Sequence, residues 1–282
     1  MNKTDFLVYV AKNVHDMKQL QINYKYLYDK YERQEMFKIA RKISRYNKIK
    51  IEESRNPIEE KKLYQNFLKS LEILNSDIIY YFFKEHLKRI TLVRSKNVLD
   101  DDAELEYDIE KNQKTKFYIN LPKTHLSITN QIGFAHEMGH IPEIDLPRHS
   151  FFEYNETLPM FFEYISALDC YDKNDAKNNF INERLSMIID DAVSLTKLYK
   201  KCEVKEEAQK LYFTQEFADT YKFLESFDYA LQLIDLFEED KQNIVSELES
   251  VINGKSLIDV SEDLLINPYG CKRLLKEYRN EE

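Results

Sequence analysis

A scarcity of glycine restricts the fold of this chain more than any other feature of its sequence. The 282 residues include four glycines and six prolines, whereas glycine alone makes up about 7% of an average protein. Tight turns and phosphate-binding loops depend on glycine because it adopts backbone conformations that other residues avoid. The sequence therefore disfavours β-sandwiches, barrels and glycine-rich nucleotide-binding folds, and it favours long helices.

The remaining composition is typical of a protein with a packed core. Hydrophobic residues make up 43% of the chain, which excludes a disordered or low-complexity protein. The apolar run near the N-terminus, residues 6–11, is too short for a signal peptide or a membrane span. The three cysteines, too few and too scattered for a disulfide framework or a cysteine-based zinc site, are Cys170, Cys202 and Cys271. We expect a soluble, cytoplasmic protein with no membrane partner.

Charge is distributed unevenly along the sequence. Residues 1–98 carry 21 basic and 12 acidic side chains, a net charge of +9, whereas residues 99–282 carry 20 and 38, a net charge of −18. The basic residues of segment 30–50 alternate with apolar residues at helical spacing, which is typical of a solvated helix face. Because the whole chain is net acidic, we expect no nucleic-acid partner.

The apolar pattern predicts a mainly α-helical fold with one small antiparallel β element. Apolar residues recur every three or four positions in three segments, and this spacing predicts helices over residues 4 to about 50, 58–74 and 77–92. Strict alternation over 103–110 and a second apolar run over 115–121 predict a β-hairpin, the only β structure expected. Helices are expected from about 128 to the C-terminus, with breaks near 142–147, 172–174, 253–255 and 267–268. We divide the chain into an N-terminal helical region, 1–98, and a catalytic region, 99–282, that together form one compact unit.

The motif that carries chemistry is His136-Glu137-Met138-Gly139-His140. On a helix, His136 and His140 lie one turn apart on the same face, so both imidazoles can reach one metal ion. Zinc accepts such nitrogen ligands in tetrahedral geometry. Glu137, next to the first ligand, is positioned to take a proton from water and pass it to a leaving amine. The pattern predicts one Zn²⁺ per chain; two surface histidines on a helix are the structural alternative.

The surrounding sequence supports a buried helix under this motif. Ser127 or Thr129 can serve as the N-cap of that helix. Pro142 is expected to end it directly after the second histidine, because proline lacks the N–H group that a helix needs. The apolar residues that indicate burial are Ile128, Ile132, Phe134 and Ala135.

A catalytic zinc needs a third protein ligand. A downstream histidine at the spacing H-E-x-x-H-x-x-G-x-x-H is absent, so we expect a carboxylate from a second helix. Glu156 is the best candidate, because the fifteen residues between His140 and Glu156 suffice to bring a second helix back antiparallel. Glu163, two helical turns further on, is suited to hydrogen-bond a ligand imidazole. Glu153 and Asp145 remain competitors, as does Glu163 itself.

These two segments resemble the M3 peptidases, the thimet oligopeptidase and oligoendopeptidase F group of glutamate-ligand zincins. His136, Glu137, Gly139 and His140 match the first motif of that family, and Glu156, Phe161 and Glu163 match the second. The resemblance covers about 135–165, in a chain about half the usual size and with a shorter loop between the motifs. It implies a helical zincin-like peptidase in which a peptide substrate pairs with strand 115–121, as an edge strand beside the active-site helix.

The resemblance also implies an oxyanion-stabilising tyrosine near the C-terminus. Tyr269 stands about where the family places it, with Tyr221 and Tyr229 as alternatives. His125 and His149 flank the motif and either line the cleft or play structural roles. Peptides or proteins are the expected substrates. Two other functions stay open: a regulatory protease resembling the ImmA-type metallopeptidases, which cleaves one protein partner, and a non-catalytic helical zinc-binding interaction protein.

Overall fold

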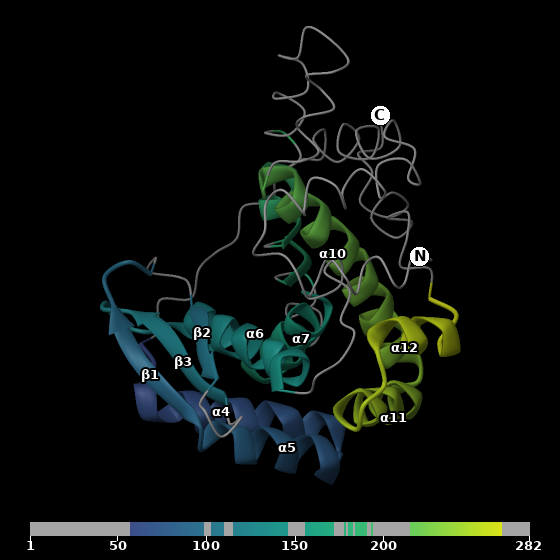
Figure 1. The fold of residues 1–282 in the computed structure, drawn as a ribbon, viewed down its shortest axis with the longest axis horizontal. Helices are drawn as coiled ribbons and strands as arrows, with labels where there is room; N and C mark the ends of the chain where they lie inside the picture. Colours follow the sequence, from purple (N-terminus) through teal and green to yellow (C-terminus); the bar gives the residue numbers. More distant parts are fainter. Residues whose placement is uncertain are drawn as a thin grey trace, which may run out of the picture.

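The computed structural model of the chain describes residues 57–98, 103–109, 115–145, 156–171, 178, 180–182, 184–190, 193 and 215–266. Within these ranges the protein is mainly helical with a small three-stranded sheet (Figure 1). The predicted fold class is confirmed at this level. The first expected helix, residues 4 to about 50, and the expected breaks at 172–174 and 267–268 lie outside the described residues.

Two helices precede the sheet. Helix α4 spans Glu60–Leu71 and continues into the 3-10 turn η1, Glu72–Leu74, which confirms the helix expected over 58–74. The side chain of Ser76 accepts a hydrogen bond from the backbone N–H of Ile79 and so caps helix α5, Asp77–Leu87. The helix expected over 77–92 is therefore too long at its C-terminal end.

The residues after α5 form a strand that the sequence pattern did not predict. Strand β1 spans Ile90–Ser95 and pairs in parallel with β3, Thr115–Pro122. The expected hairpin is confirmed, because β2, Glu104–Ile109, pairs antiparallel with β3. The strand order is β1-β3-β2, so the sheet is mixed instead of purely antiparallel. Strand 115–121 is consequently the central strand, and its expected position at the sheet edge is wrong.

The motif helix α6 spans Ile128–Asp145. Ser127 stands at its N-cap, and the side chain of Asn130 accepts a hydrogen bond from the Ser127 N–H at 2.9 Å, as in a capping box. Pro142 does not end the helix, which continues for three more residues. Met138 and Ile141, in the turn before the proline, are buried in the core and fix this part of the helix, although Pro142 cannot donate its helical hydrogen bond.

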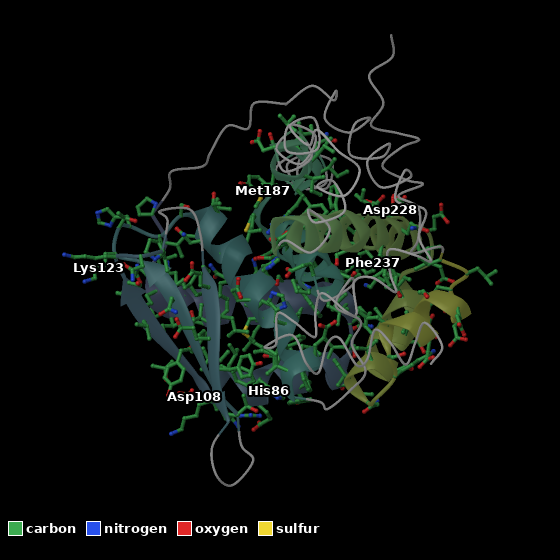
Figure 2. The ribbon with its side chains drawn as sticks, turned by 45° about the horizontal axis from the view of Figure 1, so that its top comes forward. His86, Asp108, Lys123, Met187, Asp228 and Phe237 are labelled. Carbon is green, nitrogen blue, oxygen red and sulfur yellow. The ribbon has the colours of Figure 1, made fainter. Side chains whose placement is uncertain are left out.

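Helix α7, Thr157–Cys170, lies beside α6 in the middle of the fold (Figure 1). Residues 157–167 are all buried, as expected for a helix with neighbours on every side. It packs against α6, α4 and α10, the last of which spans Gln215–Glu239. Phe237 of α10, labelled in Figure 2, meets Phe161 of α7 edge to face at 5.7 Å between ring centroids.

Two shorter helices complete the described chain. Helix α11 spans Lys241–Ile252 and α12 spans Leu257–Asp263, and the break between them is the one expected near 253–255. Both begin with a side-chain cap, from Asp240 and Ser256 respectively. Among the described residues, no helix is long and apolar enough to cross a membrane.

The core runs through all of these elements. Phe67 of α4 contacts Phe83 of α5 and Phe134 of α6 edge to face, at centroid distances of 5.3 and 5.9 Å. Phe83 in turn contacts Phe162 of α7 at 4.9 Å. These aromatic contacts fix α6 and α7 against the helices that precede the sheet, and they hold the motif helix on a rigid base.

Candidate metal centre

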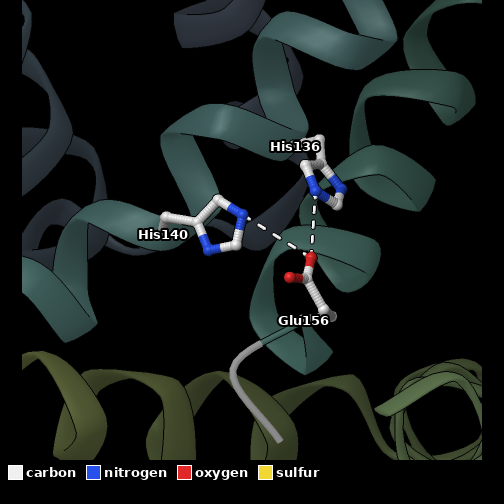
Figure 3. Close-up of side chains that lie close together, drawn as sticks. All are labelled: His136, His140 and Glu156. Atoms are coloured by element: carbon white, nitrogen blue, oxygen red, sulfur yellow. Dashed lines mark ion pairs between the residues drawn. The ribbon is translucent and has the colours of Figure 1, made fainter. Parts of the chain in front are cut away.

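Two histidines of α6 face the same carboxylate. Nε2 of His136 lies 3.2 Å from Oε2 of Glu156, and Nε2 of His140 lies 3.6 Å from that same oxygen (Figure 3). The two imidazole rings are 5.1 Å apart and almost perpendicular. The structure therefore brings together the two histidines predicted from the motif and the carboxylate predicted as their best partner.

Glu156 occupies an unusual place at the start of α7. It is the N-cap residue of that helix, yet its side chain makes no capping hydrogen bond. An N-cap side chain ordinarily accepts from the N–H of the second or third helical residue. The third residue here is Pro159, which has no N–H to donate. The carboxylate is instead directed at the histidines, while the positive end of the α7 dipole favours its negative charge.

The nitrogen–oxygen separations at this site are compatible with a tetrahedral metal ion. Zinc binds imidazole nitrogen and carboxylate oxygen at about 2.0–2.2 Å, so neighbouring ligand atoms in a tetrahedron stand about 3.3 Å apart. The two nitrogen–oxygen separations, 3.2 and 3.6 Å, bracket that value. Two neutral nitrogens and one carboxylate oxygen are also a donor set that zinc accepts in catalytic sites, where a fourth position is left for water.

The environment of His136 keeps its imidazole neutral. Burial is the main cause that lowers the pKa of His136 to about 3; the hydrogen bond to Glu156 opposes the shift, and the charge of Arg184 adds to it. A neutral imidazole is the form that binds metals. His140 is more exposed, with 19% of its side chain accessible to solvent against 11% for His136. Solvent therefore has access to the site on the His140 side.

The second nitrogen of His136 contacts Glu163. Nδ1 of the imidazole lies 3.0 Å from Oε1 of this carboxylate, which is hydrogen-bonding distance. Glu163 is only 2% exposed and projects from α7 two turns after Glu156, on the same side of the helix. This is the position that the sequence predicts for a residue supporting a ligand imidazole.

Sequence reasoning missed a fifth participant, Arg184. Its Nε donates to Oε2 of Glu163 at 2.7 Å, and its Nη2 contacts Oε1 of the same carboxylate. That Nη2 also lies 3.4 Å from Nδ1 of His136. Arg184 is one of 41 basic residues in the chain, and no motif distinguishes it from the others. Only the packing of a third helical segment against α7 reveals it.

The other predicted residues have different placements. Glu137 is buried in α6, 9% exposed, next to His136. Tyr229 donates its hydroxyl to the Leu257 carbonyl at 2.5 Å and thereby joins α10 to α12. His125 is exposed in the segment before α6. Five predicted residues fall outside the described side chains or residues: Tyr269, Tyr221, His149, Glu153 and Asp145.

Comparison of the chain with protein-family models, with curated proteins and with solved structures returns no match.

Proposed function

We propose that this protein is a zinc-dependent peptidase of the M3-like type. The observation that carries the proposal is the position of two histidine nitrogens around one carboxylate oxygen. Nε2 of His136 and Nε2 of His140 lie 3.2 and 3.6 Å from Oε2 of Glu156, as ligands of a tetrahedral zinc would. When bound there, zinc would lower the pKa of a coordinated water and polarise the carbonyl of a peptide bond. The donor set and the partly exposed His140 are suited to that chemistry.

The chain's own groups supply the remaining steps. Glu137 takes the proton of the attacking water and delivers it to the leaving amine. Tyr269 is the proposed donor to the oxyanion that forms on the scissile carbonyl. A peptide in extended conformation would add to one of the outer strands, β1 or β2, through main-chain hydrogen bonds, since β3 already has a partner on both sides.

A pair of variants tests this proposal. Glu137→Gln is expected to retain one zinc per chain and to lose about 10²- to 10⁴-fold in turnover, because it removes the proton acceptor and leaves the ligands in place. His136→Ala is expected to lose stoichiometric zinc. Zinc content by elemental analysis and cleavage of a mixed peptide library are the two measurements. Wild-type turnover by Glu137→Gln would overturn the mechanism.

The same measurements separate the alternatives. A regulatory protease of the ImmA type would leave the peptide library intact and cleave one cognate protein. A non-catalytic zinc-binding protein would hold zinc and cleave neither. A chain that binds no zinc would contradict the metal centre itself.

A further inference from the structure

We propose that Arg184 is a positioning residue of the metal centre: by clamping Glu163, it holds His136 in the tautomer whose Nε2 can bind a metal ion. This inference rests on the proposed zinc site and extends it to a side chain outside both sequence motifs.

The first step is the geometry of the contact between Arg184 and Glu163. The guanidinium of Arg184 contacts both oxygens of Glu163, through Nε to Oε2 at 2.7 Å and through Nη2 to Oε1. Such a bidentate contact fixes the plane of a carboxylate as well as its distance from the guanidinium. Glu163 is almost fully buried on the densely packed helix α7, so Arg184 determines how its two oxygens are oriented.

The second step is the tautomer of His136. A carboxylate paired with a guanidinium is a hydrogen-bond acceptor only, so the 3.0 Å contact from His136 Nδ1 to Glu163 Oε1 requires a proton on Nδ1. The neutral imidazole then has its lone pair on Nε2, which faces Glu156. The 3.4 Å approach of Arg184 Nη2 to Nδ1 would favour the opposite tautomer, but it is the longer and weaker contact.

The third step is the anchoring of Arg184. It belongs to a helical segment, residues 184–190, in which Leu185, Ile188 and Ile189 are buried. Met187, labelled in Figure 2, is half exposed on the other side of this segment. The segment is thus held by its apolar side chains. Because the Arg184 side chain is only 15% exposed, Arg184→Gln leaves the buried Glu163 without its guanidinium and is expected to lower stability, so each variant is compared as folded protein.

The test compares zinc affinity among variants by competition with a chromophoric chelator. Arg184→Gln is expected to weaken zinc binding by about 10-fold or more, the usual effect of losing a residue that supports a metal ligand. Arg184→Lys keeps the positive charge but lacks the planar guanidinium that contacts both oxygens of Glu163. This variant is expected to bind zinc more tightly than Arg184→Gln and less tightly than the wild type. Arg94→Gln is the matched control: Arg94 also donates Nε to a glutamate oxygen at 2.7 Å, that of Glu60, away from the metal centre, and its loss is expected to leave affinity unchanged.

Two further readouts distinguish positioning from general structural support. If Arg184 acts through Glu163, Arg184→Gln has no added effect in a Glu163→Gln background. Nitrogen-15 NMR of the metal-free protein is expected to show His136 protonated at Nδ1 in the wild type and a mixture of tautomers in Arg184→Gln. Circular dichroism verifies that each variant is folded.

The outcomes separate this inference from the proposed function. If the wild type holds one zinc and Arg184→Gln binds it equally tightly, the role of Arg184 is refuted while the zinc site stands. If Arg184→Gln fails to fold, the test rests on Arg184→Lys. Wild-type zinc affinity and an unchanged NMR spectrum in that variant would also refute the role of Arg184. If the wild type binds no zinc, both the proposed zinc site and the proposed role of Arg184 are refuted.

Discussion

At the scale of single residues, the candidate site depends on the carboxylate of Glu156, which stands at the N-cap of α7 but makes no capping hydrogen bond. Pro159 removes one of the two N–H groups that it could have accepted from. The sequence Glu-Thr-Leu-Pro thus leaves Glu156 at a positive helix end and available to the histidines of α6.

The neutral state of buried His136 predicts a pH dependence of stability in the metal-free protein. In the unfolded chain this imidazole takes up a proton near pH 6.5, whereas burial lowers its pKa in the folded state to about 3. As the pH falls from 6.5 toward 3, the unfolded state binds a proton that the folded state does not, so the free energy of unfolding decreases. The expected loss from this residue is on the order of a few kcal/mol.

Urea denaturation of chelator-treated protein between pH 7 and pH 4 measures this dependence. His136→Asn removes the titrating group and retains the other ionisable side chains, so its stability is expected to decline less steeply than that of the wild type. Parallel declines in the two proteins would show that His136 is not buried in its neutral form.

The residues of the site differ in how far sequence alone could identify them. The spacing of His136 and His140 predicts their shared helix face, and the distance to Glu156 allows a second helix to return. Arg184 could not be predicted, because its contact with Glu163 joins segments that are 21 residues apart through tertiary packing. Tyr269 remains a prediction.

At the scale of elements, the errors of sequence reasoning arise where long-range contacts override local pattern. Strand β1 follows α5 after two residues, and its short run of mixed residues has no clear period. It becomes a strand because β3, more than twenty residues later, offers a partner. Pro142 was expected to end α6 on local grounds alone, but the helix continues to Asp145 after the buried Met138 and Ile141.

The contact between α6 and α7 gives a prediction about Gly139. A Cβ atom at this position would lie 2.7 Å from N of Pro159 and 3.0 Å from the carbonyl carbon of Leu158. Both are backbone atoms of the first turn of α7, so they cannot move without the helix. Gly139→Ala is expected to lose about 1–3 kcal/mol from this overlap, which exceeds the gain of up to about 1 kcal/mol in helix propensity.

Because Glu156 precedes that turn, displacement of α7 is expected to weaken zinc binding as well. Thermal unfolding and zinc titration of Gly139→Ala measure the two effects. Gly133→Ala is the control for helix propensity, since Gly133 lies in the same helix and is partly exposed. An alanine at 139 that leaves both stability and affinity unchanged would contradict the close approach of the two helices.

At the scale of the whole molecule, the described residues share one core. Buried side chains from the early helices, the sheet and the C-terminal helices form a single cluster. The hydroxyl of Tyr164 on α7 donates to Glu238 on α10 at 2.7 Å, and the hydroxyl of Ser76 donates to Glu249 on α11 at 2.5 Å. A change at the junction of α6 and α7 is therefore expected to affect the unfolding of the whole structure.

This coupling predicts that zinc stabilises the whole fold. Zinc held by His136, His140 and Glu156 would join two central helices, and a ligand that binds only the folded state adds about 2.7 kcal/mol at a concentration 100 times its Kd. For a chain of this size, that free energy corresponds to a rise in Tm of roughly 5 °C. Binding of zinc to histidines in the unfolded chain would reduce the shift.

Differential scanning calorimetry with zinc, with magnesium and with a chelator measures the effect. Zinc is expected to raise the Tm and the chelator to reverse the rise, whereas magnesium, which prefers six oxygen ligands, has no comparable effect. His140→Ala removes the more exposed ligand, and the zinc-dependent rise is expected to disappear in this variant. Equal Tm shifts in wild type and His140→Ala would mean that zinc acts elsewhere on the protein, because the loss of one of its three proposed ligands would weaken zinc binding and with it the link between α6 and α7.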